Sequence, residues 1–256
     1  PVFLSPALPT ELLWHILHHC AFPSTLIICS SRAEFLSTVS RQIQHQQQPP
    51  PEPSRGAEYE EAAEGGQEAR PEEGTPPRPQ TSSTADARAT QLLAAPLYQV
   101  AVARHICVVF TPTVSHLRAY LSVFSVADSK VSAPPSPADN NSSSSSGSTA
   151  PKEALLLFYG LLDLHRNTSE WSVQGISNTA AILVETARRI GFQAVVVEPR
   201  ARGEAHTEEL LGEHMPILSG SARRAGPNLE GSGWTGRAVD VRCVLERWFR
   251  FQPGNW

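Results

Sequence analysis

The sequence predicts an α/β protein with a mostly parallel β-sheet and helices on both faces of that sheet. Four short, continuous apolar runs rich in β-branched residues are typical of strands that are buried on both sides. Between them lie segments whose apolar residues recur every three or four positions, which is the spacing of amphipathic helices. Because right-handed crossovers place such helices on the faces of a parallel sheet, the alternation predicts the fold class.

Residues 1–43 are expected to form the first helix, strand and helix of a single α/β domain. Apolar residues recur at helical spacing from Leu8 to Cys20. The apolar run Ser24 to Ser30 follows at once and predicts a buried strand. Helical spacing returns between Arg32 and Ile43.

Residues 91–126 are expected to continue the same domain with a strand at Ile106–Phe110 and a helix from Val114 to Phe124. Two polar segments, residues 44–90 and 127–151, flank this part of the chain. Gln, Pro, Glu, Gly, Ser and Thr dominate them, so they cannot bury enough apolar surface to offset the entropy of ordering. Both are predicted to be disordered linkers.

Residues 152–256 complete the predicted domain. A strand is expected from Ala154 to Gly160, a long helix from Val173 to Ile190, and a strand from Ala194 to Pro199. Gly191 stands where a helix usually ends.

The last predicted element is an antiparallel edge strand near the C-terminus. Apolar residues alternate with polar ones from Val239 to Leu245. Such alternation is typical of a strand with one exposed face, as found in antiparallel pairs.

Ligands of open α/β sheets bind beyond the carboxyl ends of the strands. The predicted strands end at four junctions, which are therefore the candidate sites: Ser30–Arg32, Thr111–Thr113, Tyr159–Asp163 and Glu198–Arg202.

Composition excludes several classes of protein. The net charge of -4 and the isoelectric point of about 6.2 do not match binding to nucleic acid through bulk charge. Four widely spaced cysteines favour a reducing compartment. No apolar segment has the length of a membrane span or the form of a signal peptide, so no membrane partner is expected. His15 and His19 have zinc-binding spacing, but no second ligand pair follows, and no metal site is expected.

The stretch from Ala154 to Pro199, ALLLFYGLLDLHRNTSEWSVQGISNTAAILVETARRIGFQAVVVEP, resembles the centre of RecA-like recombinases and their paralogues. In that family an apolar strand leads into a short turn with an Arg, a loop, a long helix with a Gln near its start, and another strand. The resemblance implies a RecA-like fold of the P-loop NTPase kind.

The residues that this family uses for ATP are missing. Active members carry a Gly-rich loop ending in Gly-Lys-Ser/Thr that binds phosphates. The strand ending at Cys29 instead leads into Ser30, Ser31 and Arg32, and Tyr159 stands in place of the magnesium-handling Asp. Ser30, Ser31, Arg32 and Tyr159 are therefore degenerate nucleotide-site positions. No catalytic residue, cofactor or small-molecule substrate is expected, unless residues preceding Pro1 supply the phosphate loop.

The resemblance implies a non-catalytic, nuclear accessory subunit in recombinational DNA repair, as in Shu-type complexes. Its partner would be a RecA-like paralogue or recombinase in a heteromer, with DNA as a second contact. The alternative is an Elongator-type ring subunit that assists tRNA wobble-uridine modification, which would be cytoplasmic. A third alternative is an F-box adaptor, because Leu8–Leu17 looks like the opening of that module.

Two groups of residues are candidate contact sites. Arginines in and beside the segment after the fourth strand are candidates for nucleic-acid binding, with an ordinary solvated loop as the alternative. These are Arg200, Arg202, Arg223, Arg224 and Arg237. Aromatic and basic residues near the C-terminus are candidates for a partner interface: Trp248, Phe249, Arg250 and Phe251.

Overall fold

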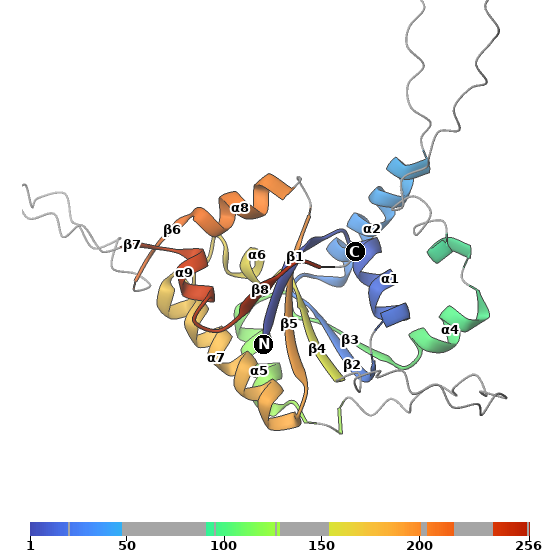
Figure 1. Ribbon diagram of the computed structural model, residues 1–256, viewed down its shortest axis with the longest axis horizontal. Coiled ribbons are helices and arrows are strands. Elements are labelled where there is room, and N and C mark those ends of the chain that lie inside the picture. Colours follow the sequence, from blue (N-terminus) through green and yellow to red (C-terminus); the bar gives the residue numbers. More distant parts are fainter. Residues whose placement is uncertain are drawn as a thin grey trace, which may run out of the picture.

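The protein is built on a central sheet of six parallel strands in the order β3-β2-β4-β5-β1-β8 (Figure 1). The computed structural model describes residues 1–19, 21–47, 91–94, 96–125, 127–128, 154–200, 204–217, 238–254 and 256. The strands of the sheet are β1 (Val2–Ala7), β2 (Ala21–Ile28), β3 (Ile106–Phe110), β4 (Ala154–Tyr159), β5 (Gln193–Pro199) and β8 (Arg250–Gln252). All neighbouring pairs in the sheet are parallel, which confirms the predicted class.

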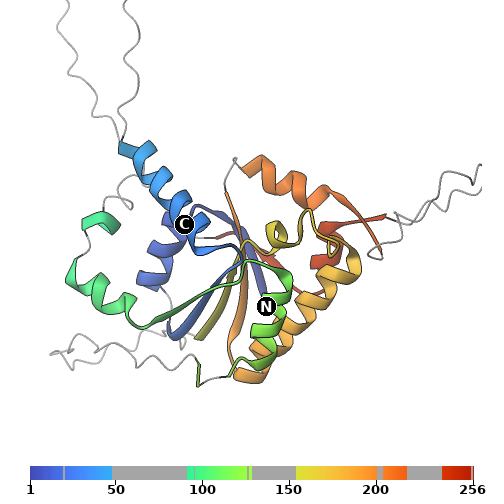
Figure 2. The ribbon, with the colours of Figure 1, turned by 180° about the vertical axis from the view of Figure 1, so that it is seen from behind.

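Helices cover both faces of the sheet, as the sequence predicts (Figures 1 and 2). One face carries α1 (Pro9–His19), α2 (Arg32–Gln47) and α4 (Leu97–Ala103). The other carries α5 (Val114–Val123), α6 (Leu161–His165), α7 (Val173–Ile190), α8 (Glu204–Gly212) and α9 (Val241–Leu245). No helix in the described part of the chain is both long enough and apolar enough to cross a membrane.

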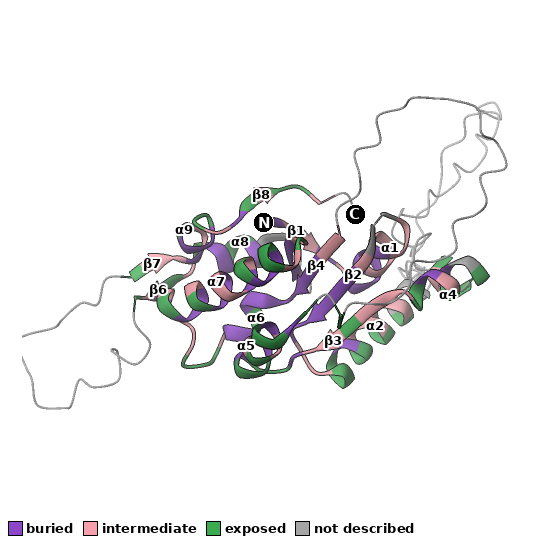
Figure 3. Cartoon of the chain, turned by 90° about the horizontal axis from the view of Figure 1, so that it is seen from below, coloured by how far each residue is buried: buried purple, intermediate pink, exposed green. Residues whose placement is uncertain are grey.

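The core consists of two apolar layers, one on each side of the sheet. Figure 3 shows the buried strands between helices whose outer sides are exposed. Side chains of β4 alternate between the layers: Leu156 and Phe158 pack beneath α5 and α7, whereas Leu157 and Tyr159 pack beneath α1 and α2. This double burial explains why β4 has no polar face in the sequence.

Most predicted elements are confirmed. The strands expected after Pro23, at Ile106, at Ala154 and at Ala194 are β2, β3, β4 and β5. The helix α7 ends where expected, since Gly191 has a φ of 73° and its N–H bonds to the carbonyls of the preceding turn. Helix α2 runs to Gln47, past its expected end. The remainder of the two predicted linkers, residues 48–90 and 129–151, lies outside the described residues.

Two strands of the sheet, β1 and β8, were not predicted from the sequence. Strand β1 contains Ser5 and Pro6, which interrupt its apolar pattern, and its pairing with β5 is irregular between Leu4 and Ala7. Strand β8 has only three residues. Long-range pairing with β5 and with each other decides that these segments are strands.

The prediction of one strand from Val239 to Leu245 is wrong in its extent. Only Ala238–Asp240 is a strand, β7, which pairs antiparallel with β6 (His214–Pro216) in a small separate sheet. The following residues form α9, because Val241, Val244 and Leu245 are buried at helical spacing. The edges of the main sheet are β3 and β8, and both are parallel to their neighbours.

Candidate functional site

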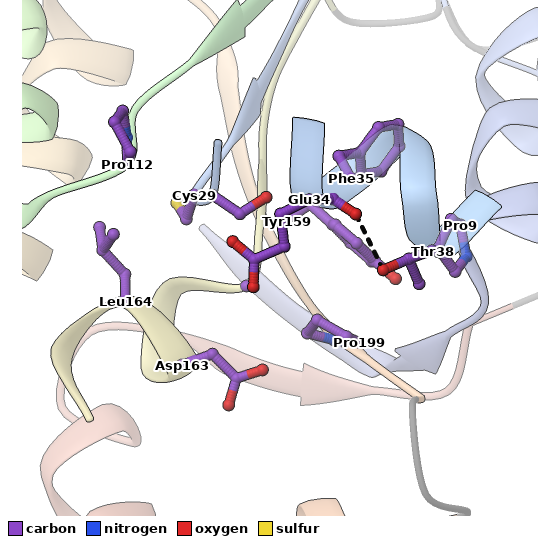
Figure 4. A pocket seen from close by; sticks show the side chains of 12 residues that line it. Pro9, Cys29, Glu34, Phe35, Thr38, Pro112, Tyr159, Asp163, Leu164 and Pro199 are labelled. Carbon is purple, nitrogen blue, oxygen red and sulfur yellow. Dashed lines mark hydrogen bonds between the residues drawn. The ribbon is translucent and has the colours of Figure 1, made fainter. Parts of the chain in front are cut away.

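A pocket of about 310 Å³ opens at the carboxyl edge of the sheet (Figure 4). Each of the four junctions predicted as candidate sites contributes to its wall, and the junction after β1 adds a fifth contribution. The lining residues are Pro9, Cys29, Ser30, Glu34, Phe35, Thr38, Pro112, Tyr159, Gly160, Asp163, Leu164 and Pro199.

The topology of the sheet explains why the pocket lies there. Strands β2 and β4 are neighbours, but β2 leads into α2 on one face and β4 leads into α6 on the other. The same divergence occurs at the adjacent strands β1 and β5, which lead into α1 and α8. Connections that leave neighbouring strands in opposite directions open a crevice, which is the usual ligand site of such sheets.

At the starts of three helices at this edge, α1, α2 and α6, a side-chain oxygen of the protein accepts one backbone N–H group. At α1, a carboxylate oxygen of Glu11 accepts the Leu8 N–H at 2.9 Å. At α2, the Ser31 hydroxyl accepts the Glu34 N–H at 3.2 Å. At α6, Oε1 of Glu198 accepts a backbone N–H at 2.9 Å. Such N–H groups bind phosphate when they are available, and here internal oxygens already use them.

The charge of the pocket is unfavourable for an anion. Its lining includes the carboxylates of Glu34 and Asp163 and no basic side chain. The adjacent Arg200 forms an ion pair with Glu11, which is itself buried. Carboxylates repel an anion, so this lining disfavours a polyphosphate.

Burial raises the pKa of the Glu198 carboxyl group well above its ordinary value, and the nearby Asp163 carboxylate adds to this effect. Glu198 is 1% exposed. Backbone N–H groups of Leu161, Leu162 and Asp163 favour the charged form, but burial outweighs them. Folded protein therefore retains this proton at a pH where the unfolded chain has released it.

Replacing Glu198 by Gln is expected to flatten the pH dependence of stability. In the wild-type protein this carboxyl group stabilises the fold most below 4.5, its ordinary pKa, and the contribution is lost as the pH rises towards the raised folded pKa. Urea denaturation between about pH 5 and about pH 8 measures the change. Glu209→Gln, at an exposed glutamate of α8, is the matched control and should keep the wild-type slope. An unchanged slope in Glu198→Gln contradicts the assignment.

Cys29 and Tyr159 are held in their protonated forms. Burial is the main cause that raises the pKa of the Cys29 thiol and of the Tyr159 phenol, and any charge on Glu198 acts in the same direction on both. The Tyr159 hydroxyl donates to the Ala7 carbonyl at 3.0 Å, and its ring packs edge-on against Phe35. At the position where the resemblance places a magnesium-handling Asp, the side chain therefore ties β4 to β1 and α2.

The four degenerate nucleotide-site positions lie around the pocket in different roles. Ser30 and Tyr159 line it, Ser31 caps α2, and Arg32 is exposed at the first position of that helix. No three His, Cys, Asp or Glu side chains of the described residues are grouped so that they could hold a metal ion.

Among the arginines proposed for nucleic-acid contact, the structure describes only Arg200. Its guanidinium pairs with Glu11 and its N–H donates to the Ala7 carbonyl at 3.0 Å, so it holds β5 against the start of α1. The predictions for Arg202, Arg223, Arg224 and Arg237 lie outside the described residues.

The aromatic residues proposed as a partner interface pack mainly within the chain. Phe249 is 3% exposed in the core, and Trp248 is partly buried against the same cluster. Phe251 stacks on Phe3 with ring centroids 4.8 Å apart, while Arg250 is exposed. Of these four residues only Arg250 is exposed, and Trp248 and Phe251 are partly exposed, so these three could contact a partner.

Two acidic residues of the site, Asp163 and Glu198, lie in the predicted junctions, but no acidic side chain was predicted to have a role there. A signal existed for two of the acidic residues: Glu198 is a charge within a continuous apolar run, and Glu11 lies three residues after Leu8, at capping-box spacing. Glu34 and Asp163 carry no such signal, because an acidic residue near a helix start is common.

Comparisons of the chain with models of protein families, with curated proteins and with solved structures found no match.

Proposed function

We propose that this chain is a non-catalytic RecA-like accessory subunit in recombinational DNA repair, which acts in a heteromer with a RecA-like paralogue or recombinase. The observation that carries the non-catalytic role is that the protein's own carboxylates accept backbone N–H groups at the carboxyl edge, Glu11 from Leu8 and Glu198 from Leu162. The recombination role rests on the resemblance of residues 154–199 to recombinase paralogues.

Two of the strand-to-helix junctions at the pocket, those after β1 and β2, support this proposal. A phosphate-binding loop follows a strand, opens a helix, and requires glycines for close backbone approach and a Lys for charge. The junction after β1 is Ala7-Leu8-Pro9, and the junction after β2 is Cys29-Ser30-Ser31-Arg32. Neither contains Gly or Lys. The volume of about 310 Å³ is also at the lower end for ligand pockets and small for a nucleoside triphosphate.

The DNA contact in this proposal is assigned to Arg202, Arg223, Arg224 and Arg237, because Arg200 is engaged by Glu11. A nuclear location follows from the proposed role. An Elongator-type subunit, located in the cytoplasm, is the alternative, since it shares the missing ATP residues.

The F-box alternative loses support from the packing of α1. Leu12 and Ile16 are 0% and 3% exposed and belong to the core beneath the sheet. A helix that is needed to cover the sheet cannot at the same time present this face to a ligase adaptor.

Affinity purification of the full chain from its native organism, with mass spectrometry of stoichiometric partners, tests the proposal. Recombinase paralogues are the expected partners. Elongator subunits would move the function to tRNA, and a ligase adaptor would restore the F-box alternative. Either result overturns the proposal.

Binding of magnesium–ATP tests the non-catalytic part separately. Isothermal titration is expected to detect no binding at about 1 mM ATP, a level at which typical ATP-using enzymes are saturated. Saturable binding at tens of micromolar would contradict the proposal that the chain has no ATP site.

A further inference from the structure

We infer that two copies of this chain associate through the open edge of β3, so that their β3 strands pair antiparallel about a two-fold axis at Val108. The inference is independent of the proposed function, because β3 lies outside residues 154–199 and does not line the pocket at the carboxyl edge. The sheet of one copy then continues into the sheet of the other.

The backbone of β3 presents a row of hydrogen-bonding groups at the edge of the sheet (Figure 3). Thr111, directly after β3, donates its N–H to the Ile28 carbonyl of β2 at 2.9 Å. Because successive residues of a strand direct their backbone groups to opposite sides, the odd-numbered residues of β3 bond to β2. Ile106, Val108 and Phe110 direct their N–H and C=O groups away from it. Within the described residues, no strand pairs with β3 on this outer side.

Antiparallel pairing centred on Val108 uses all of these groups. Val108 exchanges both backbone hydrogen bonds with Val108 of the second copy, and Ile106 exchanges both with Phe110 of the second copy. The side chains then lie opposite each other as one β-branched pair and two pairs of an aromatic with a β-branched residue, which are favourable cross-strand contacts. No residue of β3 is charged, so the two-fold axis brings no like charges together on the strands. A second copy is therefore complementary to this edge in both backbone and side chains.

Strand β3 lacks the features that protect edge strands from pairing. Such strands usually carry charges, prolines or bulges. The sequence of β3 is Ile-Cys-Val-Val-Phe, and its register with β2 is regular over all five residues. The opposite edge is protected: β8 has three residues, Arg250 is exposed, and Pro253 follows directly. Pairing is therefore expected at β3 and not at β8.

Exposed apolar side chains surround the β3 edge. Leu93 and Val108 are 49% and 45% exposed and line the same apolar groove, of about 330 Å³, between α1, α2 and β3. Helix α4, which leads into β3, has no charged residue, and its Leu97 and Val100 are exposed while its Gln99 is buried. Apolar surface gathered in one area marks an interaction site, so the side chains agree with the open backbone.

The molar mass of the full chain in solution is the direct test. The chain has a mass of 27.8 kDa, and light scattering after size-exclusion chromatography is expected to give twice this value at about 50 μM. Dilution should dissociate the dimer with a dissociation constant of roughly micromolar strength, as expected for a small interface. A monomer at about 200 μM overturns the inference.

Val108→Lys tests whether this edge forms the dimer. The substitution places two like charges opposite each other at the two-fold axis, so the variant is expected to be monomeric at about 50 μM. Val123→Lys is the matched control, because it makes the same change at an exposed position at the end of α5 and should stay dimeric. Thermal unfolding checks that both variants keep the fold. A dimeric Val108→Lys variant overturns the inference.

Val108→Pro separates strand pairing from association of apolar side chains. Proline removes the outward N–H group of Val108 and leaves the bonds of β3 to β2 intact, so an edge strand tolerates it. Loss of this donor in both copies is expected to weaken the dimer at least about tenfold. A dimer of wild-type affinity would show that the copies meet without backbone pairing, and the inference would be wrong.

Hydrogen exchange measured by NMR locates the pairing on the strand. The amides of Ile106 and Phe110 are expected to exchange slowly in the wild-type dimer and rapidly in the Val108→Lys monomer. Those of Cys107 and Val109 should exchange slowly in both proteins, because they bond to β2. Equal exchange of Ile106 and Phe110 in the two proteins contradicts pairing at this edge.

A strand of a different protein is the alternative occupant of the edge. If the wild-type chain is monomeric and Val108→Lys lowers the recovery of another protein in affinity purification, that protein binds the edge and the second copy is ruled out. The result is separate from the proposed function. A dimer recovered without recombinase paralogues contradicts the proposed function alone, and a monomer recovered with them contradicts this inference alone.

Discussion

Replacing Gly175 by Ala is expected to destabilise the protein by about 3 kcal/mol or more. A Cβ atom at this position would lie 2.2 Å from the backbone oxygen of Glu170 and 2.9 Å from its carbonyl carbon. The loop cannot simply move away, because the Ser172 side chain caps α7 by accepting the Gly175 N–H at 3.0 Å. The backbone of the loop and the first turn of the helix must therefore separate, and a cap is lost with them.

Chemical denaturation of Gly175→Ala against the wild-type protein measures this effect. Gly212→Ala is the matched control, since Gly212 ends α8 and a Cβ atom there would have nothing within 4 Å. The control should be neutral or slightly stabilising, because alanine loses less backbone entropy on folding. Equal stability of both variants would show that the loop before α7 adapts at little cost.

Replacing Arg118 by Met is expected to cost about 2 to 3 kcal/mol. The guanidinium joins α5 to α7 and to the loop before α7: it donates to the Thr179 hydroxyl at 2.9 Å, to the Glu170 carboxylate at 2.7 Å and to the Gly175 carbonyl at 2.8 Å. Its side chain is only 24% exposed, so water replaces these bonds incompletely when the charge is removed. Met retains most of the apolar stem and isolates the effect of the charged head.

The same network supports the wall of the pocket. The Thr179 hydroxyl also contacts Nε2 of His165 at 2.9 Å, and His165 is fully buried at the end of α6, the helix that carries Asp163. Burial lowers the pKa of His165, so the ring is neutral at physiological pH and does not repel Arg118. Loss of the Arg118 contacts should therefore also disturb the part of the pocket wall that α6 forms.

Thermal and urea unfolding of Arg118→Met, compared with Arg188→Met, measure the contribution. Arg188 is an exposed residue of α7 that pairs with Glu185, and its side chain is 76% exposed. Exposed pairs of this kind contribute little, so this control is expected to change stability by less than about 0.5 kcal/mol. If the two variants are equally stable, the network around Arg118 does not hold α5, α6 and α7 together.

The sequence alone determined the class of the fold and the edge of the sheet at which the pocket lies. Strands β2, β4 and β5 are continuous apolar runs because both of their faces are buried, and this pattern is visible without any structure. Once parallel strands and their helices are predicted, the position of ligand sites beyond the carboxyl ends follows from topology. The lack of lysine at the strand-to-helix junctions is likewise a property of the sequence.

Only the tertiary structure decided which segments at the two ends of the chain become strands. Strand β1 is interrupted by Ser5 and Pro6, and it becomes a strand because β5 and β8 pair with it on both sides. The residues after Asp240 alternate like a strand, yet Val241, Val244 and Leu245 pack as a helix against α7, because that packing buries all three. Short segments of this kind have no strong local preference, and long-range contacts determine their conformation.

The acidic character of the site also depends on tertiary structure. Glu11, Glu34, Asp163 and Glu198 lie in four separate segments of the chain, and no local pattern indicates that they lie at one edge. They meet at one edge because β1, β2, β4 and β5 are adjacent in the sheet and all run in the same direction. Burial then changes the chemistry of Glu198, and burial is set by the helices packed around it rather than by the residues beside it in the sequence.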